Sequence, residues 1–324
     1  MREISFSEAT LEAMAEEMER DARVFVMGED IARQGGIFGQ FKGLPQRFGT
    51  DRVLDTPISE TAIVGAGVGA ALAGMRPVVD MHFADFITVC MDEVVNQMAK
   101  IRYMFGGQCI VPVVLRAPDG IIRSAAAQHS QSLESWFLHV PGLKVVVPSN
   151  PADAKGLLKA AIRSDDPVLY FEHKALFPTK GPVPDGDHLV PIGKANIVRP
   201  GRDVTIVSYS MMLHRVLEAA DKLAGQGIEA EVIDLRTISP IDFDAIYASI
   251  AKTHRLMVVH EAVKTGGVGA EIAARVAEEN LDLLDAPIVR IGAPYVPIPF
   301  SPNLEKLVKI TADDVTLAAI KLCK

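Results

Sequence analysis

Residues 55–60 read Asp55-Thr56-Pro57-Ile58-Ser59-Glu60, and residues 65–70 read Gly65-Ala66-Gly67-Val68-Gly69-Ala70. The first stretch is typical of a turn followed by a helix cap, which predicts a helix over Glu60–Ala73. On that helix Gly65, Gly69 and Ala73 share one face, where small side chains allow another helix to approach closely. Ordinary packing of the helix on a sheet of its own domain explains the same pattern, and the residues leave both explanations open.

The same glycines satisfy the dinucleotide-binding pattern GxGxx[GA], which works where a strand turns into a helix beneath a pyrophosphate. The residues before the glycines indicate a turn and a cap instead of a buried strand. Glu60 would also place a carboxylate beside the phosphate. A nicotinamide-dependent oxidoreductase is therefore kept only as a remote alternative.

The chain has 324 residues, which exceeds the usual size of a single domain and predicts two. A net charge of −8 with scattered basic residues argues against a nucleic-acid partner. Cys90, Cys109 and Cys323 form no CxxC pair and indicate neither a disulfide framework nor a zinc site. The longest uncharged stretch, Thr61–Met75, is too short to span a bilayer, and the first residues show no apolar signal core. We therefore expect a cytoplasmic protein that does not enter the membrane.

Strand and helix patterns alternate along the chain, and near-continuous apolar strands predict parallel sheets covered on both faces. The first part, residues 1–180, is expected to contain strands at Arg23–Met27, Pro77–Met81, Ile110–Arg116, Leu143–Pro148 and Pro167–Glu172. Its expected helices are one that Ser5 or Ser7 caps and that ends near Arg20, then Glu60–Ala73, Ile87–Phe105 and Pro151–Arg163. The fold class is therefore α/β.

A cluster of prolines and glycines between Pro178 and Pro191 predicts a linker at residues 181–191. A second domain, residues 192–324, repeats the alternation of strands and helices. Its expected strands are Val204–Ser208, Glu229–Asp234, Leu256–His260 and Pro287–Ile291. Its expected helices are Met212–Ala224, Phe243–Ala251, Gly269–Asn280 and one that begins at Ala312. The chain is thus predicted to fold as two doubly wound α/β domains.

Residues 55–60 resemble a signature of the beta subunits of thiamine-dependent dehydrogenases that feed lipoyl acyltransferases. The resemblance extends over nearly the whole chain and includes Met27–Asp30, Arg102–Gly107, Ala126–Ser132, Pro141–Pro148, Asp153–Leu157 and Asp234–Thr237. Phe171–Leu176 and Ile298–Pro302 are most similar to acetoin dehydrogenase beta subunits, and pyruvate dehydrogenase beta subunits are nearly as similar. The loop Asp30–Gly39 departs from the acetoin type in being shorter. The resemblance implies a transketolase-like pyrimidine-binding domain followed by a transketolase C-terminal domain.

The resemblance also implies roles for individual residues. Glu60 would protonate the aminopyrimidine of thiamine diphosphate, Phe86 would stack on that ring, and Ile58 and Glu29 would also contact the cofactor. His129 would serve the transfer of the acyl group to a lipoyl disulfide, whose leaving sulfur takes up a proton. Each residue has a simpler explanation: Glu60 complements a helix N-terminus, Phe86 packs in the core, and His129 is a structural loop residue.

The chain lacks the Gly-Asp-Gly and downstream Asn with which enzymes of this class hold the diphosphate through magnesium. Asp185-Gly186-Asp187 has the wrong arrangement for that motif. We therefore expect an alpha subunit to supply the magnesium site, in an α2β2 heterotetramer that serves a lipoyl acyltransferase core. The resemblance further suggests a potassium ion near Val113, Ala161, Ile162 and Asp166. The predicted reaction is the cleavage of acetoin, with the decarboxylation of pyruvate as the alternative.

Overall fold

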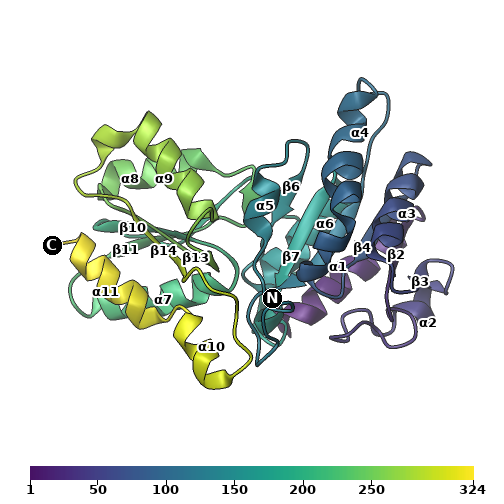
Figure 1. Ribbon diagram of the computed structural model, residues 1–324, viewed down its shortest axis with the longest axis horizontal. Coiled ribbons are helices and arrows are strands. Elements are labelled where there is room, and N and C mark those ends of the chain that lie inside the picture. Colours follow the sequence, from purple (N-terminus) through teal and green to yellow (C-terminus); the bar gives the residue numbers. More distant parts are fainter. The chain divides into compact units, whose positions relative to one another are not determined.

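The computed structural model describes all 324 residues and separates into two compact units (Figure 1). Unit 1 contains Met1–Asp119 and Trp136–Ile192, and unit 2 contains Gly120–Ser135 and Gly193–Lys324. The segment Gly120–Ser135 therefore belongs by its contacts to unit 2, although unit 1 precedes and follows it in the chain. The predicted domain limits at residues 180 and 192 stay a prediction. No helix is both long and apolar enough to cross a bilayer.

Unit 1 is built on a parallel sheet in the order β6-β7-β5-β4-β2-β3. Its strands are β2 (Val24–Gly28), β3 (Val53–Asp55), β4 (Arg76–Asp80), β5 (Val114–Asp119), β6 (Lys144–Val146) and β7 (Val168–His173). All residues of β5 and β7 are buried, as expected for central strands covered on both faces. The predicted α/β fold class is confirmed for this unit.

The longer helices of unit 1 begin where the sequence predicts. α1 (Phe6–Arg20) follows Ser5, which forms a capping box with Glu8. α6 (Pro151–Arg163) has Asn150 as its cap and proline in its first turn, which loses no hydrogen bond there. The other helices are α2 (Leu44–Phe48), α3 (Glu60–Leu72) and α4 (Ala99–Met104), and α5 (Glu134–Leu138) contains the point at which the chain passes from unit 2 back to unit 1.

Two predicted elements of unit 1 have different limits. The strand predicted at Ile110–Arg116 begins only at Val114, because Pro112 has no N–H to donate and Val113 donates to the carbonyl of Val111 in a tight turn. The single helix predicted over Ile87–Phe105 is instead a 3₁₀ helix (Ala84–Cys90) followed by a helix with a π-helical turn (Glu93–Met98) before α4. Such irregular turns often lie at functional sites.

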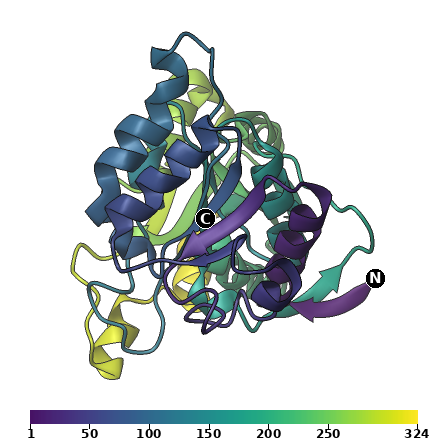
Figure 2. The same cartoon turned by 90° about the vertical axis from the view of Figure 1, so that its right-hand side faces the viewer.

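The N-terminal residues belong to a short two-stranded sheet that the sequence did not predict. β1 (Arg2–Ser5) pairs antiparallel with β8 (Lys180–Val183), and the two strands lie side by side near the N-terminus in Figure 2. β8 begins the segment predicted as a linker. Both strands have only four residues, too few for a period-2 pattern to stand out.

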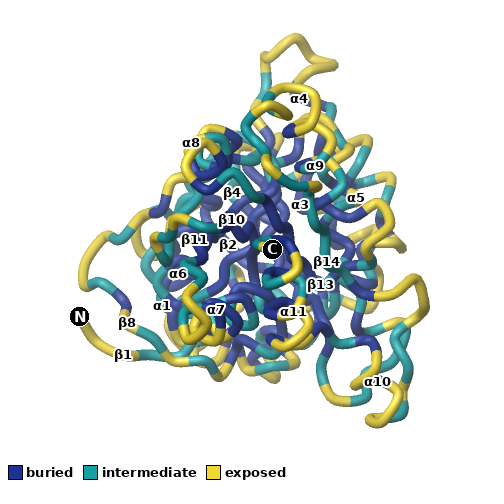
Figure 3. Tube along the Cα trace, turned by 90° about the vertical axis from the view of Figure 1, so that its left-hand side faces the viewer, coloured by how far each residue is buried: buried dark blue, intermediate teal, exposed yellow.

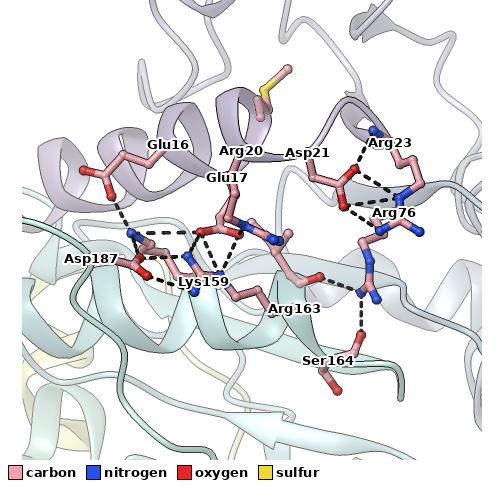
Figure 4. Close-up of polar contacts among 12 residues, drawn as sticks. Glu16, Glu17, Arg20, Asp21, Arg23, Arg76, Lys159, Arg163, Ser164 and Asp187 are labelled. Carbon is pink, nitrogen blue, oxygen red and sulfur yellow. Dashed lines mark hydrogen bonds and ion pairs between the residues drawn. The ribbon is translucent and has the colours of Figure 1, made fainter.

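A charged network joins α1 to α6 (Figure 4). Lys159 contacts Glu16 and Asp187 at 2.6 Å each, and Arg163 contacts Glu17 and Asp187 at 2.7 Å each. The Arg163 and Lys159 hydrogen bonds hold the pKa of Asp187 well below its usual range. Glu17 is fully buried, which is tolerated because its charge is paired. Asp187 thus fixes the segment after β8 to the outer face of α6.

Unit 2 has a second sheet in the order β14-β13-β10-β11-β9, in which only β9 runs antiparallel to its neighbour. Its strands are β9 (Asn196–Arg199), β10 (Val204–Ser208), β11 (Ala230–Asp234), β13 (Leu256–Val263) and β14 (Val289–Ala293), and β12 (Thr237–Ser239) is not part of this sheet. Its helices are α7 (Ser210–Ala224), α8 (Phe243–Thr253), α9 (Val268–Glu279), α10 (Pro302–Val308) and α11 (Ala312–Leu322). Figure 3 shows the buried strands enclosed by partly exposed helices, so the predicted second α/β domain is confirmed.

His260 on β13 is fully buried in unit 2. A Cβ added to Gly267 would lie 2.4 Å from its ring, and one added to Gly292 would lie 2.8 Å from it, so glycines provide the space that the imidazole fills. Its Nδ1 lies 3.1 Å from the carbonyl oxygen of Ala262. Burial lowers the pKa of His260 from 6.5 to about 4.

We expect His260 to make the folding stability of the chain fall below pH 6.5. The folded pKa lies below the unfolded value, so the unfolded chain binds more protons between pH 6.5 and pH 4. The contribution is fully present above pH 6.5, and about 2–3 kcal/mol of it is lost by pH 4. Urea unfolding of the native chain and of His260→Leu at several pH values measures it. Equal pH slopes for the two proteins would contradict it.

Candidate active site

Three adjacent parallel strands of unit 1 end at the same edge of their sheet. β2 ends at Gly28, β3 at Asp55 and β4 at Asp80, and these residues are in register across the sheet. Ligands of α/β proteins bind outside the carboxyl ends of such strands. Glu29, Glu60 and His82 follow the three strand ends directly or within a few residues. This edge of the sheet is therefore the candidate active site.

Asp55 and Thr56 hold the backbone of this edge. The Asp55 carboxylate accepts hydrogen bonds from the backbone N–H groups of Ala32, at 2.6 Å, and Arg33, at 3.2 Å. The Thr56 N–H donates to the carbonyl of Gly28 at 2.9 Å. The first two residues of the 55–60 segment thus fix the loop after β2, and Ile58 and Glu60 stay available for other contacts.

Glu60 is the first residue of α3, and its carboxylate has no partner in the chain. No hydrogen bond or ion pair of the structure engages this partly exposed side chain, and Ser59 forms no side-chain cap. Ile58 is 82% exposed beside it. The simpler explanation, a glutamate that serves only the helix N-terminus, leaves the exposed Ile58 unexplained. An unpaired carboxylate next to an apolar side chain suits a heterocyclic ligand with an N–H donor.

Glu29 lies behind this position and is 6% exposed. His82 contacts it twice, with Nδ1 at 3.2 Å from the carboxylate and Nε2 at 2.9 Å from the backbone oxygen. Burial raises the pKa of Glu29, His82 opposes that shift, and the negative charge of Glu60 adds to it. Glu29 and Glu60 are thus electrostatic neighbours. From the sequence alone His82 is expected to be a packing residue, and its contact with Glu29, 53 positions away, cannot be predicted from a local pattern.

Phe86 belongs to the 3₁₀ helix that packs beside the start of α3. The Thr61 hydroxyl donates to the carbonyl of Val89 at 3.0 Å, which ties the first turn of α3 to that helix. Phe86 meets Phe83 edge-to-face at 5.7 Å, and Phe83 meets Phe38 in the same manner at 5.9 Å. Phe38 comes from the loop Asp30–Gly39, so aromatic packing holds this loop at the site. Phe86, Glu60, Ile58 and Glu29 therefore all belong to one edge of unit 1.

The glycines of α3 divide between two environments. A Cβ added to Gly67 would lie 2.6 Å from Cγ1 of Val79 on β4, whereas one added to Gly69 would meet nothing within 4 Å. Packing on the sheet of the same domain thus explains Gly67. It does not explain Gly69, which faces outward. The dinucleotide-binding interpretation is excluded, because these glycines lie inside a helix and not between a strand and a helix.

We expect Gly67→Ala and Gly69→Ala to change stability in opposite directions. Gly67→Ala forces Val79 to move and should lower the free energy of unfolding by about 1–3 kcal/mol. Gly69→Ala should raise it by up to about 1 kcal/mol, because alanine is the better helix former. Chemical unfolding of the isolated chain measures both variants. Loss of stability in both would show that Gly69 also packs against the chain.

A buried ion network lies in the sheet beneath this edge. Arg116 on β5 is 1% exposed and pairs with Asp80 at 3.4 Å and with Glu172 on β7. Its guanidinium also lies 4.9 Å from the centre of the Phe41 ring. Burial raises the pKa of Asp80 and that of Glu172, and Arg116 opposes both shifts. No local pattern indicates this network, since its members sit on three separate strands.

His129 lies in the segment Gly120–Ser135 and therefore in unit 2, whereas Glu60 and Phe86 lie in unit 1. It is partly exposed, and its backbone N–H donates to the carbonyl of Ala126 at 3.4 Å. The neighbouring Ser130 is 1% exposed. The structure thus assigns His129 to the unit formed mainly by the second half of the chain.

The residues named for potassium gather at one end of unit 1. The Val113 carbonyl accepts from Val168 N–H, the Ala161 carbonyl from Ser164 N–H, and the Ile162 carbonyl from Arg76. Asp166 pairs with Arg102 and Lys144. Each carbonyl keeps a second lone pair, so the potassium site stays a prediction. No group of three or more His, Cys, Asp or Glu side chains is placed to hold a metal ion.

Two family models match the chain. Residues 2–180 match the model described as Transketolase, pyrimidine binding domain, and residues 193–315 match the one described as Transketolase, C-terminal domain. With two α/β units and a candidate site at the carboxyl ends of parallel strands, the chain is a transketolase-like protein. This class depends on thiamine diphosphate, as the resemblance predicted.

Relatives matched over nearly their whole length define the class further. An acetoin:2,6-dichlorophenolindophenol oxidoreductase subunit beta of Cupriavidus necator is 49% identical over 100% of this chain and 98% of its own. A 2-oxoisovalerate dehydrogenase subunit beta of Bacillus subtilis is 47% identical, with 100% of both chains covered. A mitochondrial pyruvate dehydrogenase E1 component subunit beta-2 of Oryza sativa subsp. japonica is 46% identical over 99% of this chain and 87% of its own. The chain belongs to the family of beta subunits of acetoin and 2-oxo acid dehydrogenases.

A solved structure agrees with this fold. The chain described as "Split gene transketolase, inactive beta4 tetramer" superposes with a TM-score of 0.82 and covers 99% of this chain and 98% of its own. Its sequence identity is 24%, so the likeness concerns the fold alone.

Proposed function

We propose that this chain is the beta subunit of a thiamine-diphosphate-dependent dehydrogenase that cleaves acetoin. The carbon–carbon bond of acetoin breaks, acetaldehyde leaves, and the remaining two-carbon unit passes as an acetyl group to a lipoyl disulfide, which is thereby reduced. The observation that carries the proposal is the unpaired carboxylate of Glu60 at the carboxyl edge of a parallel sheet. The 49% identity to acetoin-oxidising beta subunits supports the choice of substrate.

The residues at this edge fit an aminopyrimidine ring. Glu60 would accept the hydrogen bond of a ring nitrogen and hold its proton, and Ile58 and Phe86 would offer apolar and aromatic surface to the ring. The negative charge of Glu29 would add to the negative potential near Glu60, and its contact with His82 would hold the Glu29 carboxylate in place. When bound, thiamine diphosphate supplies a carbon nucleophile that attacks the substrate carbonyl.

The other half of the site is assigned to a partner. This chain has no Gly-Asp-Gly motif and no cluster of acidic side chains for magnesium, and Asp187 is occupied by Lys159 and Arg163. An alpha subunit would hold the diphosphate through magnesium, in an α2β2 heterotetramer that serves a lipoyl acyltransferase core. The outward-facing Ala62, Ala66 and Gly69 of α3 would let that subunit approach close to Glu60.

His129 would act in the second half of the reaction. The sulfur that leaves the lipoyl disulfide takes up a proton, and an imidazole is a suitable donor near neutral pH. The polar residues around His129 and its partial exposure support this role. A structural potassium ion near Val113 and Asp166 is kept as a further proposal.

A second substrate class is favoured by the relative that acts on 2-oxoisovalerate, which covers this chain completely at 47% identity. The pyruvate-type relative supports the same class. The experiment is to reconstitute the chain with its alpha subunit and to compare acetoin, pyruvate and branched 2-oxo acids in thiamine-dependent dye reduction. We expect the highest kcat/KM with acetoin. A preference for a 2-oxo acid would change the substrate, and inactivity with all of them would refute the function.

A further inference from the structure

The segment Gly120–Ser135, which carries His129, is tied to unit 2 at both of its ends by one carboxylate. Glu261 on β13 accepts a hydrogen bond from the Ile121 N–H at 2.8 Å and one from the Ser132 hydroxyl at 3.3 Å, both at Oε1. Hydrogen bonds to a charged acceptor are stronger than those between neutral groups. One side chain of a sheet strand therefore joins the beginning and the end of the loop.

A second carboxylate holds the middle of the same loop. Glu305 on α10 is 4% exposed, and its Oε2 accepts from the Ser124 N–H at 2.7 Å. Its other oxygen pairs with Lys309, one turn later on the chain. Lys309 thus holds one carboxylate oxygen of Glu305, and the other oxygen holds the loop through the Ser124 N–H.

The backbone between Glu305 and His129 adopts conformations that need such support. Ser124 has a φ of 50° and Ala126 a φ of 62°, in the left-handed region that costs free energy for residues other than glycine. The carbonyl of Ala126 then accepts from the His129 N–H at 3.4 Å. A short chain of contacts therefore runs from Glu305 through Ser124 and Ala126 to His129.

We propose that Glu305 and Glu261 are positioning residues that hold the His129 loop in the geometry needed for acyl transfer. The carboxylates stabilise a loop conformation that its own residues disfavour, and they place the imidazole at a fixed point of unit 2. Neither carboxylate is required to touch substrate. The inference rests on the acyl-transfer role proposed for His129.

The test uses the complex reconstituted with the alpha subunit and compares two rates for each variant. The first is reduction of 2,6-dichlorophenolindophenol by the donor substrate, and the second is acylation of a lipoyl domain. For Glu305→Ala we expect the ratio of acylation to dye reduction to fall about tenfold, because a small displacement of a catalytic group is costly. Glu305→Gln keeps an acceptor for Ser124 N–H and should restore the ratio to within about threefold of the native value.

Glu231 offers a matched control in the same unit. It is 1% exposed, accepts from the Gly201 N–H at 3.2 Å and pairs with Lys252, but it contacts no residue of the His129 loop. Glu231→Ala should lower thermal stability as Glu305→Ala does and leave the ratio of the two rates as it is. A change in the ratio as large as that of Glu305→Ala would overturn the inference.

A double-mutant comparison separates positioning from general damage. If Glu305 acts through His129, then Glu305→Ala should lower the ratio no further when His129→Ala is already present. Independent, additive effects would overturn the inference, and so would equal losses in both rates for Glu305→Ala alone. If the native complex acylates no lipoyl domain with any donor, the proposed function itself fails, and that result is seen before any variant is measured.

Discussion

Glu60→Gln should reduce the thiamine-dependent activity of the reconstituted complex by about 10²–10⁴-fold, the range that acid–base catalysis by one side chain contributes. Glutamine keeps the shape of the side chain but cannot carry the negative charge that holds a proton on the ring nitrogen. Because no hydrogen bond or ion pair of the chain involves Glu60, its replacement should change the free energy of unfolding by less than about 0.5 kcal/mol. Activity is measured by dye reduction and stability by urea unfolding.

Glu271 provides the control for this variant, because it is an exposed carboxylate in the first turn of α9 and has no place in the site. Glu271→Gln should keep the activity of the native complex. If Glu60→Gln also kept full activity, Glu60 would serve only the N-terminus of α3, and the assignment of the site to this edge would lose its main support.

Arg116→Met should lower the free energy of unfolding by about 3–5 kcal/mol. The substitution keeps most of the apolar bulk beside Phe41 but leaves Asp80 and Glu172 buried without their counter-charge. The loss of stability therefore comes from two buried carboxyl groups without a counter-charge and not from a cavity. Urea unfolding at pH 7 measures this effect on the isolated chain.

The origin of that loss can be tested by neutralising the partners of Arg116. The triple variant Asp80→Asn, Arg116→Met, Glu172→Gln removes every charge of the network, and it should recover at least half of the lost stability. If the triple variant were less stable than Arg116→Met alone, the packing of the arginine and not its charge would be what the fold requires.

Local sequence signals predicted the elements whose causes are local. Ser5 with Glu8 and Asn150 with Pro151 determine where α1 and α6 begin, and the structure has both helices there. β1 and β8 were missed because two four-residue strands are recognised only by pairing with each other across the chain. The strand predicted from Ile110 began late because Pro112 and the turn at Val113 end the pairing that its apolar pattern suggested.

The site shows the same difference between what local signals predict and what depends on contacts between distant residues. The positions of Glu60, Phe86 and His129 came from short motifs, and the structure shows that the first two belong to one edge of unit 1. The groups that hold them in place could not be predicted. Asp55 binds amides more than 20 positions earlier, and Glu261 and Glu305 bind the His129 loop across more than 100 positions. Such contacts depend on which strands and loops the fold brings together, and no local pattern encodes them.

The central claim is that this chain holds only the aminopyrimidine half of a cofactor site. The most direct measurement is thiamine-diphosphate-dependent dye reduction by the purified chain, alone and with increasing amounts of its alpha subunit. We predict no activity for the chain alone, and activity that saturates at one alpha chain per beta chain. Activity of the isolated chain comparable to that of the complex would contradict the claim, because the chain would then bind the diphosphate without a partner.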